Sequence, residues 1–113
     1  MNTATPFKWH HFEAEIILLW DVREAEWSVE RLVRVPLTQG QFDALVDFTF
    51  NLGSARLAAS TLLRELNAGR FDLAASELLR WDHSGGKELE SLKARRKAEY
   101  ALWRAARDGQ SVA

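Results

Sequence analysis

The stretch from Leu37 to Gly53 constrains the fold more than any other part of the sequence. It begins with a capping-box pair, Thr38 and Gln41, directly after a proline, and it ends at a glycine. Apolar side chains recur through it at helical spacing and fill further faces: Phe42, Leu45, Val46, Phe48, Phe50 and Leu52. A helix that is apolar on most of its faces lies inside a domain. We therefore expect a central helix here, with the rest of the chain packed around it.

Helical patterns also occupy most of the remaining sequence. We expect further helices over residues 12–32, 61–67, 71–81 and 88–107, at most one short turn over 54–59, and a loop over 82–86. Residues 3–39 contain neither the glycine nor the asparagine that hairpin turns normally need, and no convincing strand pattern appears. We predict an all-α fold, a single helical domain of about five helices around a central buried helix. The predicted divisions are an N-terminal arm over 1–12, the helical domain over 13–109 and a frayed tail over 110–113.

Composition excludes several classes of function. The formal net charge is −1 at pH 7, whereas a general nucleic-acid binder is normally strongly basic. The absence of cysteine excludes disulfides, thiolate nucleophiles and cysteine-based metal sites. The three histidines lack ligand partners at helical spacing, so we expect no metal and no cofactor. No stretch is long and apolar enough to span a membrane, and we expect no signal peptide.

Several motifs, in order along the chain, carry a resemblance to a known family. They are Val35-Pro36-Leu37-Thr38-Gln39-Gly40-Gln41-Phe42-Asp43-Ala44-Leu45, Phe50-Asn51-Leu52-Gly53, Ser60-Thr61-Leu62-Leu63, Leu66-Asn67-Ala68-Gly69, Leu79-Arg80-Trp81, Gly85-Gly86-Lys87 and Leu92-Lys93-Ala94-Arg95-Arg96-Lys97-Ala98-Glu99. From about Glu13 to Arg107 the chain resembles the phage-type lysozymes, the muramidase endolysins of glycoside hydrolase family 24. The resemblance implies hydrolysis of the β-1,4 bond between N-acetylmuramic acid and N-acetylglucosamine in peptidoglycan.

The resemblance covers the helical C-terminal lobe of that family. In the family, a β-rich N-terminal lobe brings a glutamic acid as general acid, followed by an Asp (or Cys) and a Thr. No glycine- and aromatic-rich hairpin follows an early glutamate in this sequence. Phe12-Glu13-Ala14 resembles the family's Phe-Glu-Gly at the catalytic acid, but Glu13 also fits the start of the helix before the central block. We therefore expect a truncated member with weak or no catalysis.

The resemblance also suggests substrate-binding residues, each with a structural alternative. The end of the central helix, Asn51 and Gly53, would line the sugar-binding cleft, or Asn51 would satisfy free helix carbonyls. Trp81 would stack on a sugar face, or belong to the core. Arg96 would bind substrate, or pack along Trp81 or pair with an acid.

Carboxyl pairs are the chemistry that glycoside hydrolysis requires, at about 5 Å for retention or about 6.5–9.5 Å for inversion. Glu26/Glu30 and Asp43/Asp47 have the i,i+4 spacing that brings side chains together on a helix. Both pairs lie on polar helix sides, where nothing is expected to raise a pKa. We interpret them as surface acids.

Partners and location follow from the same resemblance. We expect the peptidoglycan saccharide as ligand, and the host bacterial cytoplasm with release to the cell wall as location. An exposed cleft wall around the central helix predicts association, in which Pro6-Phe7-Lys8-Trp9-His10-His11-Phe12 covers the wall in its own chain or in a second copy. The alternatives to an enzyme are a non-catalytic peptidoglycan-binding or protein-interaction module, or a degenerate prophage remnant.

Overall fold

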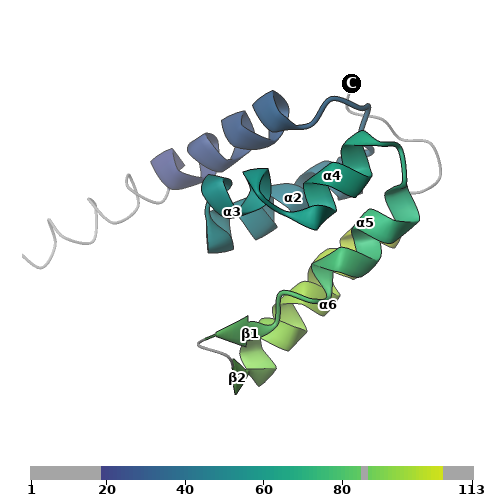
Figure 1. The fold of residues 1–113 in the computed structure, drawn as a ribbon. Coiled ribbons are helices and arrows are strands. Elements are labelled where there is room, and N and C mark those ends of the chain that lie inside the picture. Colours follow the sequence, from purple (N-terminus) through teal and green to yellow (C-terminus); the bar gives the residue numbers. More distant parts are fainter. Residues whose placement is uncertain (1–18, 85–86, 106–113) are drawn as a thin grey trace, which may run out of the picture.

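The computed structural model describes residues 19–84 and 87–105, and this part of the chain is all-α apart from one very short hairpin (Figure 1). Its helices are the first helix (residues 19–32), α2 (Gln39–Leu52), α3 (Ser54–Ala58), α4 (Thr61–Asn67), α5 (Phe71–Leu78) and α6 (Glu90–Ala105). The hairpin pairs β1 (His83–Ser84) antiparallel with β2 (Lys87–Glu88). The predicted arm, the candidate acid Glu13 and the predicted tail lie outside the described residues.

The ends of α2 confirm the signals in its sequence. The Thr38 hydroxyl accepts a hydrogen bond from the Gln41 amide at 3.1 Å, and the Gln41 side chain accepts one from the Thr38 amide at 2.9 Å. Gly53 then stops the helix with φ of 100°, a conformation that side chains with a Cβ rarely adopt. The reciprocal cap and the glycine therefore fix the length of α2.

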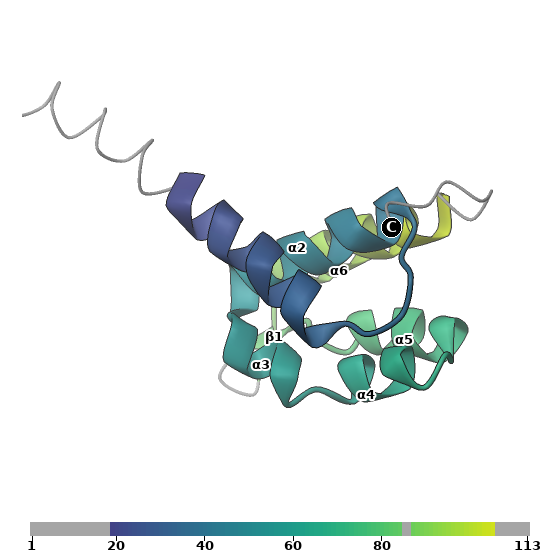
Figure 2. The ribbon, with the colours of Figure 1, turned by 90° about the horizontal axis from the view of Figure 1, so that it is seen from above.

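A single apolar core lies between α2 and the helices that pack on one side of it. Phe48, Leu45 and Ala44 of α2 are fully buried, as are Leu66 of α4 and Leu78 of α5. Both views place α6 beside α2, and α4 packs against α5 (Figures 1 and 2). The expectation of a core built around the central helix is confirmed for this side.

The other side of α2 departs from the expectation that the helix is buried all round. Phe42 and Val46 are half-buried, and Phe50 is 36% exposed. These three residues follow one another at i, i+4 and i+8, so they form one stripe along the helix. We call these three residues the open stripe of α2. They are as apolar as the buried residues of the helix, so the sequence pattern alone did not distinguish the two faces.

Some predicted boundaries were also wrong. The segment predicted as one helix over 71–81 leaves the α-helix at Leu78, because the next three amides bond three residues back, as Trp81 N does to Leu78 O at 3.2 Å. Residues 54–58 form a five-residue helix instead of at most one turn. The predicted loop over 82–86 contains β1, whose pairing with β2 is followed by a hydrogen bond from Leu89 N to Asp82 O.

The connector between the first helix and α2 is held by one side chain from α4. The Asn67 amide nitrogen donates to Leu32 O at 3.0 Å, and its oxygen accepts from Arg34 N at 2.7 Å. The first bond satisfies a carbonyl at the end of the first helix, where no helical partner exists. Asn67 thereby fixes where the first helix ends relative to α4.

Candidate functional site

Two ion pairs from α6 meet the middle of α2. Arg95 donates twice to the Asp47 carboxylate, with Nε to Oδ2 at 3.0 Å and Nη2 to Oδ1 at 2.8 Å, across 48 positions of sequence. Arg96 turns to the other side and donates from Nη2 to Glu99 Oε2 at 2.6 Å. Adjacent residues on a helix point in different directions, so the two arginines bind different carboxylates.

Arg96 also organises the aromatic part of the site. Its guanidinium carbon lies 5.4 Å from the centre of the Phe48 ring, and Nη1 donates to the Trp81 carbonyl at 3.5 Å. Phe48 and Trp81 meet edge to face, with ring centres 5.5 Å apart and planes at 88°. Such contacts are favourable for a cation and for aromatic pairs. Arg96 is therefore a buried side chain that holds Phe48 and Trp81 in position. This arrangement agrees with the structural alternative from the sequence, in which Arg96 packs along Trp81 or pairs with an acid.

The carboxyls of Glu99 and Asp47 are neighbours whose pKa values move in opposite directions. Burial, and next the hydrogen bond with Asp47, raise the pKa of Glu99 to about 8, against the opposing charge of Arg96. Burial also acts to raise the pKa of Asp47, but hydrogen bonds with Glu99 and Arg95 outweigh it and hold that pKa below its ordinary value. Among the described residues, Glu99 Oε1 is buried and has no hydrogen-bond partner. The raised pKa favours the protonated form of Glu99 near neutral pH.

This carboxyl pair does not have the geometry of a glycosidase. Glu99 is 1% exposed and is held by Arg96 Nη2 at 2.6 Å, so it is closed to a saccharide and to an attacking water. Asp47 is, moreover, fixed by both nitrogens of Arg95. The Asp47 side chain is 37% exposed and its pKa is lowered, which agrees with its interpretation as a surface acid, although its ion pair with Arg95 was not foreseen. Asp43 is exposed and accepts a hydrogen bond from Gln39.

The structure places the predicted saccharide-binding residues in two neighbouring settings. Gly53 is exposed at the end of α2 and borders a hollow of about 220 Å³, together with Phe50 and Ser28. Asn51 is half-buried, and its Oδ1 is buried without a donor among the described residues. Trp81 is half-buried, whereas Arg96 has no exposed surface. Trp81 and Arg96 both contact Phe48, so the structure brings these two predicted residues together. The saccharide-binding roles of all four residues stay predictions.

The part of the chain that the structure describes shows neither a metal-binding cluster nor a membrane-spanning helix. Residues 19–84 and 87–105 contain no cluster of three or more His, Asp or Glu side chains arranged to hold a metal ion. No helix within the same ranges has both the length and the apolarity needed to cross a bilayer.

The fold and the motifs that build this site define a phage-type lysozyme helical domain. The model of the phage lysozyme family matches residues 3–99, and the chain belongs to this family. The sequence-based resemblance is thereby confirmed.

Individual relatives agree with this assignment. The endolysin of Bacillus phage B103 is 48% identical over 91 residues, which are 80% of this chain and 35% of that protein. The solved muramidase domain of SpmX from Asticaccaulis excentricus superposes with a TM-score of 0.73 at 38% identity, over 80% of this chain and 64% of that one. A solved structure of P22 lysozyme superposes with a TM-score of 0.69 at 40% identity, over 74% of this chain and 57% of that one. The chain spans about a third of the B103 endolysin's length.

Sequence reasoning missed Glu99, Asp47 and Arg95 as members of the site. A signal for Glu99 was present, since it stands three residues after an arginine on the apolar stripe of the last helix. A buried arginine needs a hydrogen-bonding partner, and Glu99, one helical turn further on, is placed to provide it. The partnership of Arg95 with Asp47 had no local signal, because it depends on how α6 packs on α2.

Proposed function

We propose that this domain is a peptidoglycan-binding wall of a phage-type lysozyme, and that by itself it cleaves the β-1,4 glycosidic bond weakly or not at all. The observation that carries the proposal is the carboxyl arrangement. Glu99 is buried and held by Arg96, and Asp47 is held by two nitrogens of Arg95, so the two carboxyls with shifted pKa values are not open to a glycosidic bond. Belonging to the family supplies the substrate class.

The saccharide contact that we propose is the C-terminal end of α2. Asn51 Oδ1 is buried and unpaired among the described residues, so a sugar hydroxyl would reach it once the Asn51 side chain turns outward. Gly53 leaves the adjacent backbone exposed, and Trp81, which Arg96 holds through its carbonyl, is half-buried and offers an apolar edge. In this arrangement Arg96 acts by positioning Trp81 and does not touch the saccharide.

Sedimentation with insoluble peptidoglycan tests the binding proposal. The domain should pellet with the polymer, and Asn51→Ala should weaken binding several-fold, since each hydrogen bond contributes about 0.5–1.5 kcal/mol. Ser76→Ala, an exposed residue of α5, is the matched control and should bind normally. If Asn51→Ala binds peptidoglycan as well as Ser76→Ala does, Asn51 is not part of the binding site.

A second candidate function, protein association, is favoured by exposed apolar side chains on the first helix. Leu19 is 70% exposed, Trp20 59% and Trp27 48%, and the two indoles meet with ring centres 6.4 Å apart. Contiguous exposed apolar surface of this kind marks association sites. The partner that we propose is a second copy of the chain. Analytical ultracentrifugation should show a concentration-dependent dimer, and a monomer at every concentration would refute it.

A further inference from the structure

The open stripe of α2 borders two neighbouring hollows, which together we call the groove. One hollow of about 400 Å³ is bordered by Val33, Leu37 and Phe42, and a second of about 550 Å³ by Phe42, Val46 and Phe50. The two hollows share Glu26 and Phe42 in their linings, so they lie next to each other along the helix. The first helix forms one wall and α6 the other, through Ala98 and Leu102. A groove with an apolar floor of this length suits an elongated segment with its own apolar side chains.

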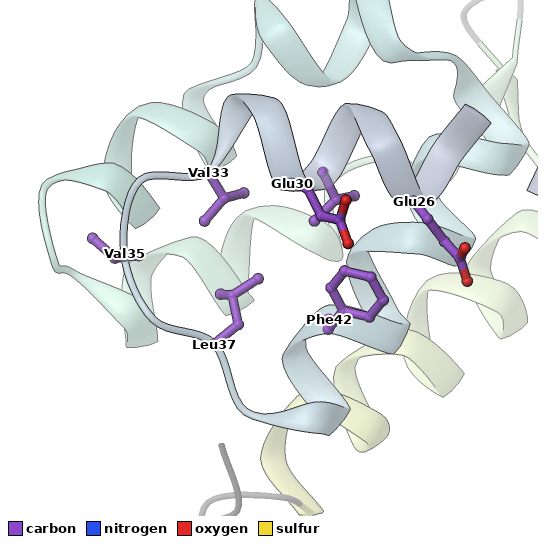
Figure 3. Close-up of a pocket in the computed structure, with 7 residues that line it drawn as sticks. Glu26, Glu30, Val33, Val35, Leu37 and Phe42 are labelled. Atoms are coloured by element: carbon purple, nitrogen blue, oxygen red, sulfur yellow. The ribbon is translucent and has the colours of Figure 1, made fainter. Parts of the chain in front are cut away.

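The rim of the groove is acidic. Glu26 and Glu30 extend from the first helix on the side that faces Phe42 (Figure 3), and Asp43 adds a third carboxylate from α2. Arg95, the cation of the groove lining, is already committed to Asp47. Glu26 lies 3.5 Å from Arg23 in an exposed pair of the kind that contributes little. The groove therefore favours an occupant that is both aromatic and basic.

We propose that the occupant is the segment Pro6–Phe12 of a second copy of this chain. This segment carries three aromatic side chains, Phe7, Trp9 and Phe12, together with Lys8, His10 and His11. Seven residues span up to about 25 Å when extended, and the open stripe from Phe42 to Phe50 is about 12 Å long. In an extended chain Phe7 and Trp9 lie on one side and Lys8 and His10 on the other, so the first pair matches the floor and the second the rim.

A second copy of the chain would cover more of the exposed apolar surface than the chain's own segment would. The groove begins at Val22 and Glu26 of the first helix, and the exposed Leu19, Trp20 and Trp27 belong to the same helix. Its N-terminal end projects beyond the other described helices (Figure 2). Seven residues in the groove leave that projecting surface uncovered, whereas a second domain packed there covers it as well. The inference rests on the proposed dimer and identifies its contact.

Cysteine cross-linking tests the contact cleanly, because the chain contains no cysteine. Thr5→Cys places a thiol at the edge of the segment, and Ala98→Cys places one in the groove at an exposed alanine. Ala68→Cys, an exposed alanine after α4, is the matched control. On mixing and oxidation, the Thr5→Cys chain should join the Ala98→Cys chain at least about tenfold faster than the Ala68→Cys chain, because docking raises the local thiol concentration.

Three results would overturn the inference in distinguishable ways. Equal cross-linking rates with the Ala98→Cys and Ala68→Cys chains mean that the groove is not the contact. If ultracentrifugation still shows a dimer, the dimer forms through another surface. A Thr5→Cys/Ala98→Cys double variant that closes within a monomer, at a rate independent of dilution, assigns the groove to the chain's own segment. A monomer at all concentrations refutes both the inference and the dimer, while peptidoglycan binding is measured separately.

Charge reversal provides a second readout. Lys8→Glu should weaken the dimer by roughly two- to tenfold, and high salt should reduce that difference. Lys97→Glu, an exposed residue of α6 that does not border the groove, should leave the dimer unchanged. Equal effects of the two variants would show that net charge, and not the groove, governs association.

Discussion

Arg96 donates a hydrogen bond to Glu99 one helical turn away, with 2.6 Å between Nη2 and Oε2 and side-chain exposures of 0% and 1%. Two groups that would normally be charged are thus enclosed in the domain, between Phe48 and the Trp81 carbonyl on one side and Asp47 on the other. The pair therefore makes the stability of the domain depend on both partners and on pH.

Removing one partner should be costly. Arg96→Met should lower the free energy of unfolding by about 1–3 kcal/mol, because the buried Glu99 Oε2 and the Trp81 carbonyl then lose their donor. The double variant Arg96→Met/Glu99→Leu should lose less than the sum of the single variants, since the orphaned carboxyl is gone. Urea unfolding measures both, with Lys97→Met on the exposed face as control. Additive losses would mean that the pair does not interact.

The pKa of Glu99 predicts a pH dependence of stability. The folded-state pKa of about 8 exceeds the unfolded value of about 4.3, so between these values the folded chain holds a proton that the unfolded chain has released. Stability should therefore be greatest at low pH within this window and fall as pH rises toward 8, by at most about 1.4 kcal/mol per unit. Asp47, whose pKa is lowered, acts in the opposite sense and below this window.

Glu99→Gln isolates this effect. Glutamine resembles the protonated acid, so the variant should lose the decline between pH 5 and 8 and be more stable than the parent at pH 8. Glu90→Gln, at an exposed position on the same helix, should keep the parental profile. Thermal melts at several pH values provide the measurement, and a Glu99→Gln profile parallel to the parent's would show that Glu99 is ionised throughout.

Phe48 should be the most sensitive apolar residue of α2. It is fully buried and contacts both Trp81 and Arg96, so Phe48→Ala should cost about 3–5 kcal/mol in the free energy of unfolding. Phe50→Ala, two residues on and 36% exposed, should cost far less. Chemical denaturation separates the two. Similar losses would contradict the assignment of Phe50 to an open stripe.

The capping box of α2 should contribute a smaller amount. Thr38→Ala removes the acceptor for the Gln41 amide and should cost about 1 kcal/mol. Thr38→Ser retains the hydroxyl and should restore most of that loss. Urea titrations of the three proteins are sufficient, and an equally destabilised serine variant would show that the threonine methyl, not the cap, matters.

Local signals allowed most of the fold to be predicted from the sequence. The Thr38–Gln41 cap and the Gly53 stop act within one or two turns, and both were confirmed. The Arg95–Asp47 pair, the Asn67 clamp and the open stripe depend on how distant helices meet. Periodicity shows that a face is apolar, but it cannot show whether another element covers it.

The proposed function is tested most directly by incubating the purified domain with insoluble peptidoglycan and measuring both bound protein and newly formed reducing ends. Each hydrolysed glycosidic bond creates one reducing end, so binding and chemistry are read from the same sample. We expect the domain to pellet with the polymer, Asn51→Ala to bind several-fold more weakly, and reducing ends to stay near the level without protein. Release of reducing ends at the rate of an ordinary lysozyme, or failure of the domain to pellet, would contradict the proposal.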